Sequence, residues 1–104
     1  QLTLPMLAVG AKGVISVVSN ILPAQMHELC DDFFNGDIEN SAAMQKRLSG
    51  IMQSMFCQPN PIPVKAAQML MGLNDGSLRM PLTKIDREAM QTVMNEMKKF
   101  QLIN

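Results

Sequence analysis

The chain has 104 residues, 47% of them hydrophobic, and its nine basic and nine acidic side chains give a formal net charge of zero. A chain of this length can form one domain with a modest core. The balanced charge gives no electrostatic support for binding nucleic acid or an anionic membrane, so neither is expected as a partner.

The composition also predicts how the core is filled. The chain has eleven methionines but only four phenylalanines, and it has no tryptophan or tyrosine. Methionine is flexible and polarizable, so we expect these side chains to fill the core rather than form a recognition surface or a metal site.

Cysteine usage and the N-terminal sequence bear on the location of the protein. Cys30 and Cys57 are too few and too irregularly placed for a disulfide framework or a zinc site, which favours reduced thiols. No basic stretch precedes an apolar run, and no apolar segment approaches about 18 residues. These features predict a cytoplasmic protein. Gln1 runs directly into an apolar segment without an initiator methionine, which indicates a start inside a longer protein.

The first elements are a short helix or extended connection over residues 2–9 and then a β-strand. Pro5 is tolerated in the first turn of such a helix. Val14 to Val18 is a β-branched block with one serine, which is typical of a strand buried on both faces. Buried unpaired amides cost about 1 to 3 kcal/mol each, and no second strand of similar quality follows. The strand must therefore pair with another molecule, or the chain lacks its sheet.

The remainder of the chain is predicted to be helical. Pro23 is suited to a first helical position, apolar residues then recur at helical spacing, and Asn35-Gly36 predicts the stop. A second helix is expected from residue 37 or 38 to about Phe56. The proline run 59–63 predicts extended chain.

Asn60 is the expected N-cap of a third helix, which runs through Met71 and is closed by Gly72. A turn at 74–77 and an irregular segment at 78–83 follow. Asp86 is the expected N-cap of the last helix, with Ile85 and Met90 at the positions of a hydrophobic staple.

The side chains that most often carry chemistry do not assemble a site. Gly10-x-x-Gly13 lacks the spacing of a phosphate-binding loop and favours a tight turn. The only histidine, His27, has no second ligand residue near it and is expected at the surface. The remaining candidates have no neighbouring residue in the sequence that would serve as a base, a paired carboxylate or an activating charge, and these are Asp31, Asp32, Ser16, Ser19, Lys12 and Lys65.

Several segments in order nevertheless resemble the C-terminal third of the dihydrodipicolinate synthase family. These are residues 10–17 with Asn20, 26–30, 59–65, 71–73 and 78–83, of which the proline run and Arg79-x-Pro81-Leu82-Thr83 are the most specific. The family comprises pyruvate-dependent class I aldolases related to N-acetylneuraminate lyase.

The resemblance implies an α/β fold, the C-terminal part of a (β/α)₈ TIM barrel with a helical extension. Val14 to Val18 would be the eighth strand and Pro23 to Phe34 the eighth helix. Residues 1–36 would form the last βα unit, and residues 37–104 the C-terminal extension. Residues before Gly10 would end the seventh helical segment, near a subunit contact of the family's homotetramer.

The resemblance also implies a chemistry whose main residues lie outside this chain. In the family a lysine forms an imine with pyruvate, the enamine attacks aspartate semialdehyde, and cyclisation gives 4-hydroxy-tetrahydrodipicolinate for lysine and diaminopimelate biosynthesis. No catalytic residue, metal ligand or further cofactor is expected here. Ile15 matches an eighth-strand residue that contacts pyruvate mainly through its main chain. Lys12 would enter the strand from the opposite, non-catalytic end.

Three hypotheses remain open from the sequence. The first is a C-terminal part of this lyase, inactive without the rest of the barrel. The second is a non-catalytic helical module that serves oligomerisation, since the helices after Gly36 carry their own apolar stripes. The third is a related pyruvate aldolase with another aldehyde substrate.

Overall fold

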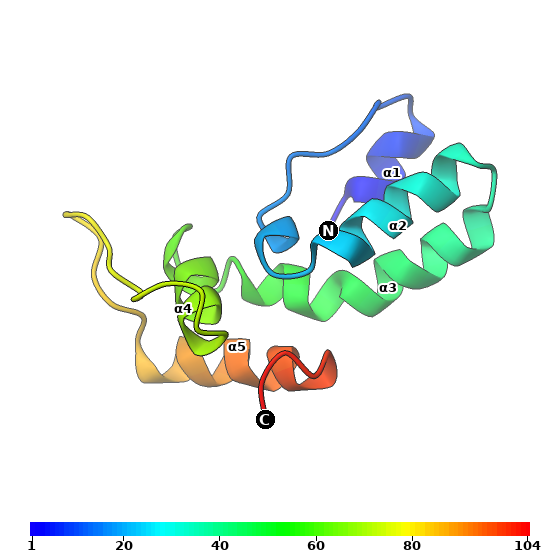
Figure 1. Ribbon diagram of the computed structural model, residues 1–104. Coiled ribbons are helices and arrows are strands. Elements are labelled where there is room, and N and C mark those ends of the chain that lie inside the picture. Colours follow the sequence, from blue (N-terminus) through cyan, green and yellow to red (C-terminus); the bar gives the residue numbers. More distant parts are fainter. The chain divides into compact units, whose positions relative to one another are not determined.

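The computed structural model describes all residues, 1–104, and contains helices and loops but no strand. The helices are α1 (Thr3–Ala8), the 3₁₀ helix η1 (Val18–Asn20), α2 (Pro23–Phe34), α3 (Ile38–Ser54), α4 (Ile62–Leu70) and α5 (Arg87–Lys99) (Figure 1). No helix is both long enough and apolar enough to cross a bilayer. The chain divides within α3 into two compact units, Gln1–Ser49 and Gly50–Asn104.

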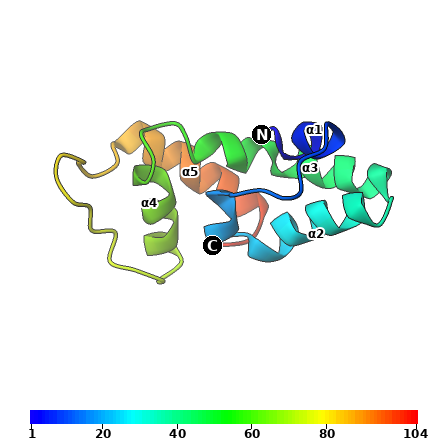
Figure 2. The ribbon, with the colours of Figure 1, turned by 90° about the horizontal axis from the view of Figure 1, so that it is seen from above.

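The first unit packs α1, η1 and α2 with the beginning of α3. α2 lies beside the first turns of α3 in both views (Figures 1 and 2), and the Ser41 hydroxyl donates a 2.8 Å hydrogen bond to the Leu29 carbonyl. Gln45 joins the start of the chain to α3, because its Oε1 accepts from Leu4 N at 3.0 Å. The buried apolar side chains of this unit are Leu7, Val18, Ile21, Leu22, Met26, Leu29, Met44 and Leu48.

The predicted strand at Val14 to Val18 is wrong for this chain. Residues 11–15 form no regular structure, and Val18 begins η1 instead. Val14 and Ile15 are exposed, although a strand buried on both faces was expected. The physical reason is that a β-ladder needs a second strand, and the chain supplies none.

The helix boundaries before the proline run agree with the sequence pattern. α1 confirms a short helix in residues 2–9. α2 begins at Pro23 and ends before Gly36, whose φ of 87° is the left-handed stop that was predicted. α3 confirms the second predicted helix, although its regular part ends at Ser54 rather than Phe56.

The second unit packs α4 against α5, with residues 71–86 forming a long loop between them (Figure 2). Its buried apolar side chains include Ile51, Met52, Met55, Ile62, Val64, Ala66, Ala67, Ala89, Val93 and Met97. The expectation of a methionine-filled core is confirmed in part. Five of the eleven methionines are buried, whereas Met6, Met69 and Met80 are exposed.

The start of α4 differs from the prediction. Pro61 rather than Asn60 occupies the N-cap position, no side chain caps the helix, and residues 57–61 form bends and a turn instead of extended chain. Pro63 is accommodated in the first turn, where its missing N–H needs no partner. The end agrees with the prediction, because Gly72 follows the helix with a φ of 73°.

The start of α5 is the local signal that the sequence predicted best. Asp86 is the N-cap, and its Oδ1 accepts a 2.8 Å hydrogen bond from Ala89 N. The expected staple residues Ile85 and Met90 line the same cavity of this unit. The predicted turn at 74–77 is also present, because Asn74 Oδ1 accepts from Gly76 N at 2.8 Å.

Candidate functional site

Ile15, the predicted substrate-contacting residue, lies in the segment that connects α1 to η1. Gly10, with a φ of 104°, turns the chain out of α1, and Ala11 N donates to Met6 O at 2.9 Å. The segment ends where the Ser19 hydroxyl donates to Ser16 O at 2.5 Å. Between these two fixed ends the side chain of Ile15 is fully exposed.

The main chain of this segment is open on both edges. No hydrogen bond of the structure involves the main chain of Lys12, Gly13, Val14 or Ile15. Figure 1 shows the segment as an extended stretch that arches from α1 to η1 without a neighbouring strand. An open edge of this kind is a template for pairing with another strand. This stretch, residues 12–15, is called the open segment below.

An apolar groove lies between the open segment and α1. It has a volume of about 310 Å³, and its apolar lining includes Leu2, Met6, Val14 and Ile15. The remaining side chains along it are those of Gln1, Thr3 and Ala11, and no acid or base is among them. The groove can therefore bind apolar surface, but it holds no group suited to proton transfer.

Three other candidates from the sequence, His27, Asp31 and Lys65, do not line the groove beside Ile15. His27 is exposed, as predicted, and Asp31 is exposed on α2. Lys65 has a structural role, because its Nζ donates a 2.8 Å hydrogen bond to Ser77 O. No group of three or more His, Cys, Asp or Glu side chains lies close enough together to hold a metal ion.

Both thiols are free. Cys30 is half-buried and Cys57 is exposed, with its Sγ 4.0 Å from Ala89 O. Burial raises the pKa of both thiols above their ordinary value, and Asp86 adds a further upward effect on the pKa of Cys57. A raised pKa disfavours the thiolate, so neither group has the environment of an activated nucleophile.

One cavity was missed by reasoning from the sequence. It lies in the Gly50–Asn104 unit between α4, the loop 71–86 and the start of α5, and its volume is about 190 Å³. Asp75 and Lys84 belong to its lining, although neither stands in a recognisable motif. The only sequence signal was the pair of charged residues on either side of the segment Leu78 to Leu82, which is apolar except for Arg79.

Comparison with known families agrees with the family resemblance found in the sequence, over nearly the whole chain. A model of the Dihydrodipicolinate synthetase family matches residues 1–100. The chain therefore belongs to this family.

Named relatives and solved structures agree with that assignment. A 4-hydroxy-tetrahydrodipicolinate synthase from Thermotoga petrophila is 43% identical over 101 residues, covering 97% of this chain and 34% of the relative. The enzyme of that name from Archaeoglobus fulgidus is 44% identical over 103 residues, covering 99% and 36%. The crystal structure of dihydrodipicolinate synthase from Thermotoga maritima superposes with a TM-score of 0.96 at 41% identity, covering 98% and 35%. The chain spans about a third of the length of these relatives.

Proposed function

We propose that the chain is the C-terminal part of a 4-hydroxy-tetrahydrodipicolinate synthase, a lyase of lysine and diaminopimelate biosynthesis. The proposal is supported by its family, by identities above 40% to synthases from a bacterium and an archaeon, and by the third of their length that it matches. The observation that carries it is the open segment, which overlaps the β-branched block Val14 to Val18 and has no strand beside it.

In this proposal, the open segment completes a (β/α)₈ barrel as part of its eighth strand. The partner of the open segment is the rest of the barrel, which supplies strands on both of its edges. Pairing would satisfy the free main-chain groups, each worth about 1 kcal/mol, and would cover Val14 and Ile15. The apolar groove beside α1 favours the same role, because it offers further surface to cover.

The chemistry would take place at a site to which this chain contributes one contact. Pyruvate would form an imine with a lysine outside the chain, and the enamine would add to aspartate semialdehyde without a further cofactor. Ile15 would contact pyruvate through its main chain at the catalytic end of the strand. The assembled enzyme would be a homotetramer.

A chimera tests this proposal. The matching third of the Thermotoga maritima synthase is replaced by this chain, and the purified protein is treated with pyruvate and borohydride, which traps an imine on lysine. We expect one pyruvate adduct in the intact mass and condensation of pyruvate with aspartate semialdehyde. The unmodified synthase is the positive control.

Variants and alternative outcomes make the test decisive. Ile15→Ala in the chimera should leave the Michaelis constant for pyruvate nearly unchanged, because the proposed contact is made by the main chain. A folded chimera without an adduct would refute the barrel role. If the chain alone then formed one homogeneous oligomer, the result would favour the hypothesis of a non-catalytic oligomerisation module over the barrel role. An adduct with turnover of a different aldehyde would identify the related aldolase instead.

A further inference from the structure

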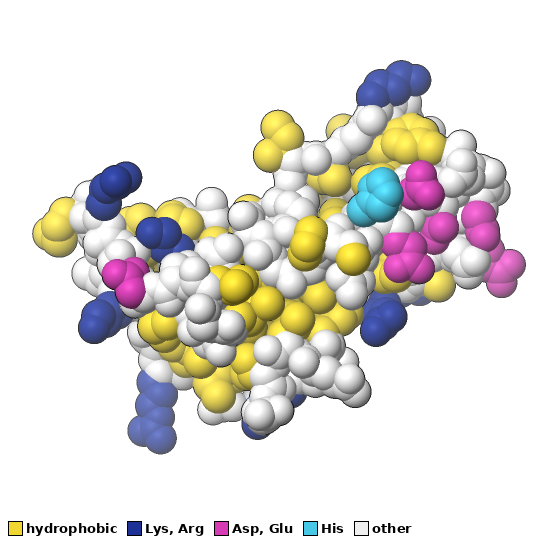
Figure 3. Space-filling model, in the orientation of Figure 1, with side chains coloured by type: hydrophobic (Ala, Val, Ile, Leu, Met, Phe, Trp, Pro, Cys, Tyr) yellow, Lys and Arg dark blue, Asp and Glu magenta, His cyan; other side chains and the backbone are white.

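The cavity of the Gly50–Asn104 unit combines an apolar wall with a charged mouth. Figure 3 shows hydrophobic side chains over this part of the molecule, with Lys and Arg side chains projecting around them. The cavity is partly open to solvent and has a volume of about 190 Å³. Its apolar lining consists of Ile62, Ala66, Met69, Leu78, Ile85 and Met90.

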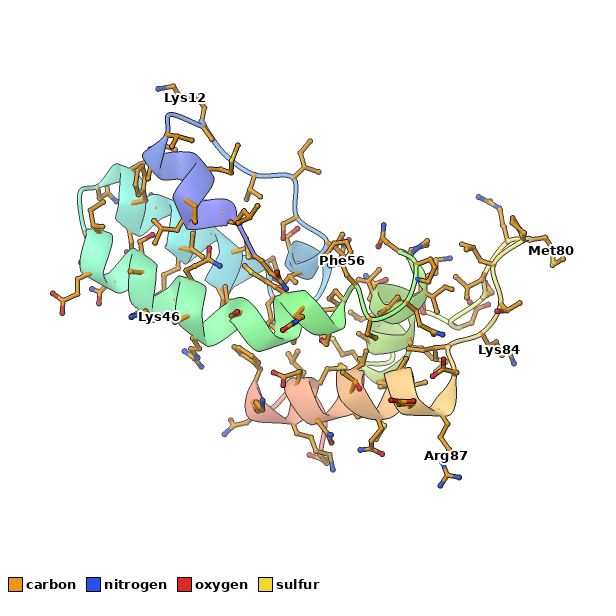
Figure 4. All side chains as sticks on the ribbon, turned by 180° about the vertical axis from the view of Figure 1, so that it is seen from behind. Lys12, Lys46, Phe56, Met80, Lys84 and Arg87 are labelled. Atoms are coloured by element: carbon orange, nitrogen blue, oxygen red, sulfur yellow. The ribbon has the colours of Figure 1, made fainter.

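Two opposite charges stand at the mouth. Asp75 and Lys84 both line the cavity and both are exposed. No hydrogen bond or ion pair of the structure involves the Lys84 ammonium, and Figure 4 shows this side chain extending from the segment that leads into α5. Ser77 N donates a 2.9 Å hydrogen bond to the Asp75 carboxylate. Bonding to Ser77 lowers the pKa of Asp75, so the carboxylate is charged at neutral pH.

The loop that carries Asp75 is held in place without a ligand. Lys65 Nζ donates to Ser77 O at 2.8 Å and so ties the loop to α4. Gly76 adopts a φ of 71° and lies against Met69, since an added Cβ would stand 2.6 Å from the Met69 sulfur. A mouth that is already ordered loses little conformational entropy when a ligand binds.

We propose that this cavity binds a free α-amino acid with an aliphatic or thioether side chain, such as leucine or methionine. The side chain occupies the apolar cavity, the ligand carboxylate faces Lys84, and the ligand ammonium faces Asp75. A cavity of about 150 Å³ lined by aliphatic and aromatic side chains is large enough to bind benzene, so 190 Å³ accommodates a branched aliphatic side chain.

The lining also predicts which ligands are rejected. A charged amino-acid side chain would lose its hydration against six apolar residues without gaining a partner. A neutral hydrocarbon could fill the cavity but would form no ionic contact with Asp75 or Lys84 at its mouth. The proposal goes beyond the proposed function and does not depend on it, because binding here is measured without any turnover.

Binding can be followed on the full 104-residue chain with ¹³C-methyl-labelled methionine. Met69 and Met90 both line the cavity, so their methyl resonances should shift and saturate as leucine is added. The resonances are assigned with Met69→Leu and Met90→Leu. Two analogues test the charges, namely 4-methylpentanoate, which lacks the ammonium, and 3-methylbutylamine, which lacks the carboxylate. Each should bind about tenfold more weakly than leucine.

Charge variants complete the test. Lys84→Met retains the aliphatic stem, and Asp75→Asn retains an acceptor for Ser77 N; each should weaken leucine binding by about tenfold. Lys12→Met, in the other unit, is the matched control and should leave the affinity unchanged. The proposal is overturned if leucine causes no saturable shift. It is also overturned if leucine, the analogues and the variants all give the same affinity, because the cavity would then bind apolar groups without recognising the charges.

Discussion

Replacing the N-cap Asp86 is expected to destabilise the Gly50–Asn104 unit through two separate contacts. One carboxylate oxygen accepts from Ala89 N at 2.8 Å, and the other accepts from Gln58 Nε2 at 2.6 Å. Loss of an N-cap acid costs about 1 kcal/mol, and the exposed contact to Gln58 adds about 0.5 to 1 kcal/mol. Asp86→Ala should therefore lower the free energy of unfolding by about 1.5 to 2 kcal/mol.

Urea unfolding followed by far-ultraviolet circular dichroism measures this change. Asp86→Asn keeps an acceptor for Ala89 N and should lose less than about 0.5 kcal/mol. Gln58→Ala removes the second contact and also the 3.3 Å hydrogen bond that Asp86 N donates to Gln58 Oε1. Asp86→Ala retains that main-chain donor, so a double-mutant cycle with Asp86→Ala should show coupling from the side-chain contact. Asp31→Ala, an exposed acid within α2, is the matched control and should not destabilise. The reasoning fails if Asp86→Asn loses as much stability as Asp86→Ala, or if the cycle shows no coupling.

Four further predictions concern packing, backbone and thiol chemistry. Gly50→Ala should change the free energy of unfolding by less than about 1 kcal/mol, because the Glu96 carboxylate that a Cβ would meet can rotate and helix propensity improves. Gly76→Ala should cost about 1 to 2 kcal/mol at its φ of 71°, and an equal effect of the two substitutions in urea unfolding would contradict one of these two expectations. Met97→Ala removes a fully buried side chain and should cost about 2 to 5 kcal/mol by the same measurement, whereas a loss below 1 kcal/mol would mean that the site collapses. Cys57 should react with iodoacetamide more slowly than free cysteine at neutral pH, and its alkylation rate should increase as the pH rises toward its raised pKa. The rate is measured by intact-mass kinetics, and alkylation of Cys57 faster than that of free cysteine at neutral pH would contradict the expectation.

Local signals fixed helix ends well where one residue decides the geometry. Gly36 and Gly72 adopt the positive φ that ends a helix, and Asp86 caps α5 with its own side chain. The prediction failed at Asn60, because Pro61 occupies the N-cap position and the helix begins only at Ile62. A cap signal is therefore reliable when a single residue can satisfy it and ambiguous when prolines offer several starts.

The cavity could not be predicted because its lining comes from three elements that meet only in the folded unit. Ile62 begins α4, Leu78 lies in the loop, and Met90 belongs to α5. Helical periodicity predicts that Ile62 and Met90 face inward, but it makes no prediction for Leu78 in the loop. It does not predict that their packing leaves a space, because a cavity depends on the volumes of all the facing side chains together.

Val14 to Val18 show that a strand-like side-chain pattern does not form a strand unless a second segment pairs with it. The β-branched pattern is a property of these residues, whereas a strand is a property of at least two segments. In this chain Val18 still becomes buried within η1, because α2 supplies a surface for it, but Ile15 stays fully exposed. Val18 is therefore covered by the chain's own helices, whereas Ile15 lies on an open edge that another segment would have to cover. The open segment, rather than any titratable side chain, is therefore the feature of this chain that supports the proposed function.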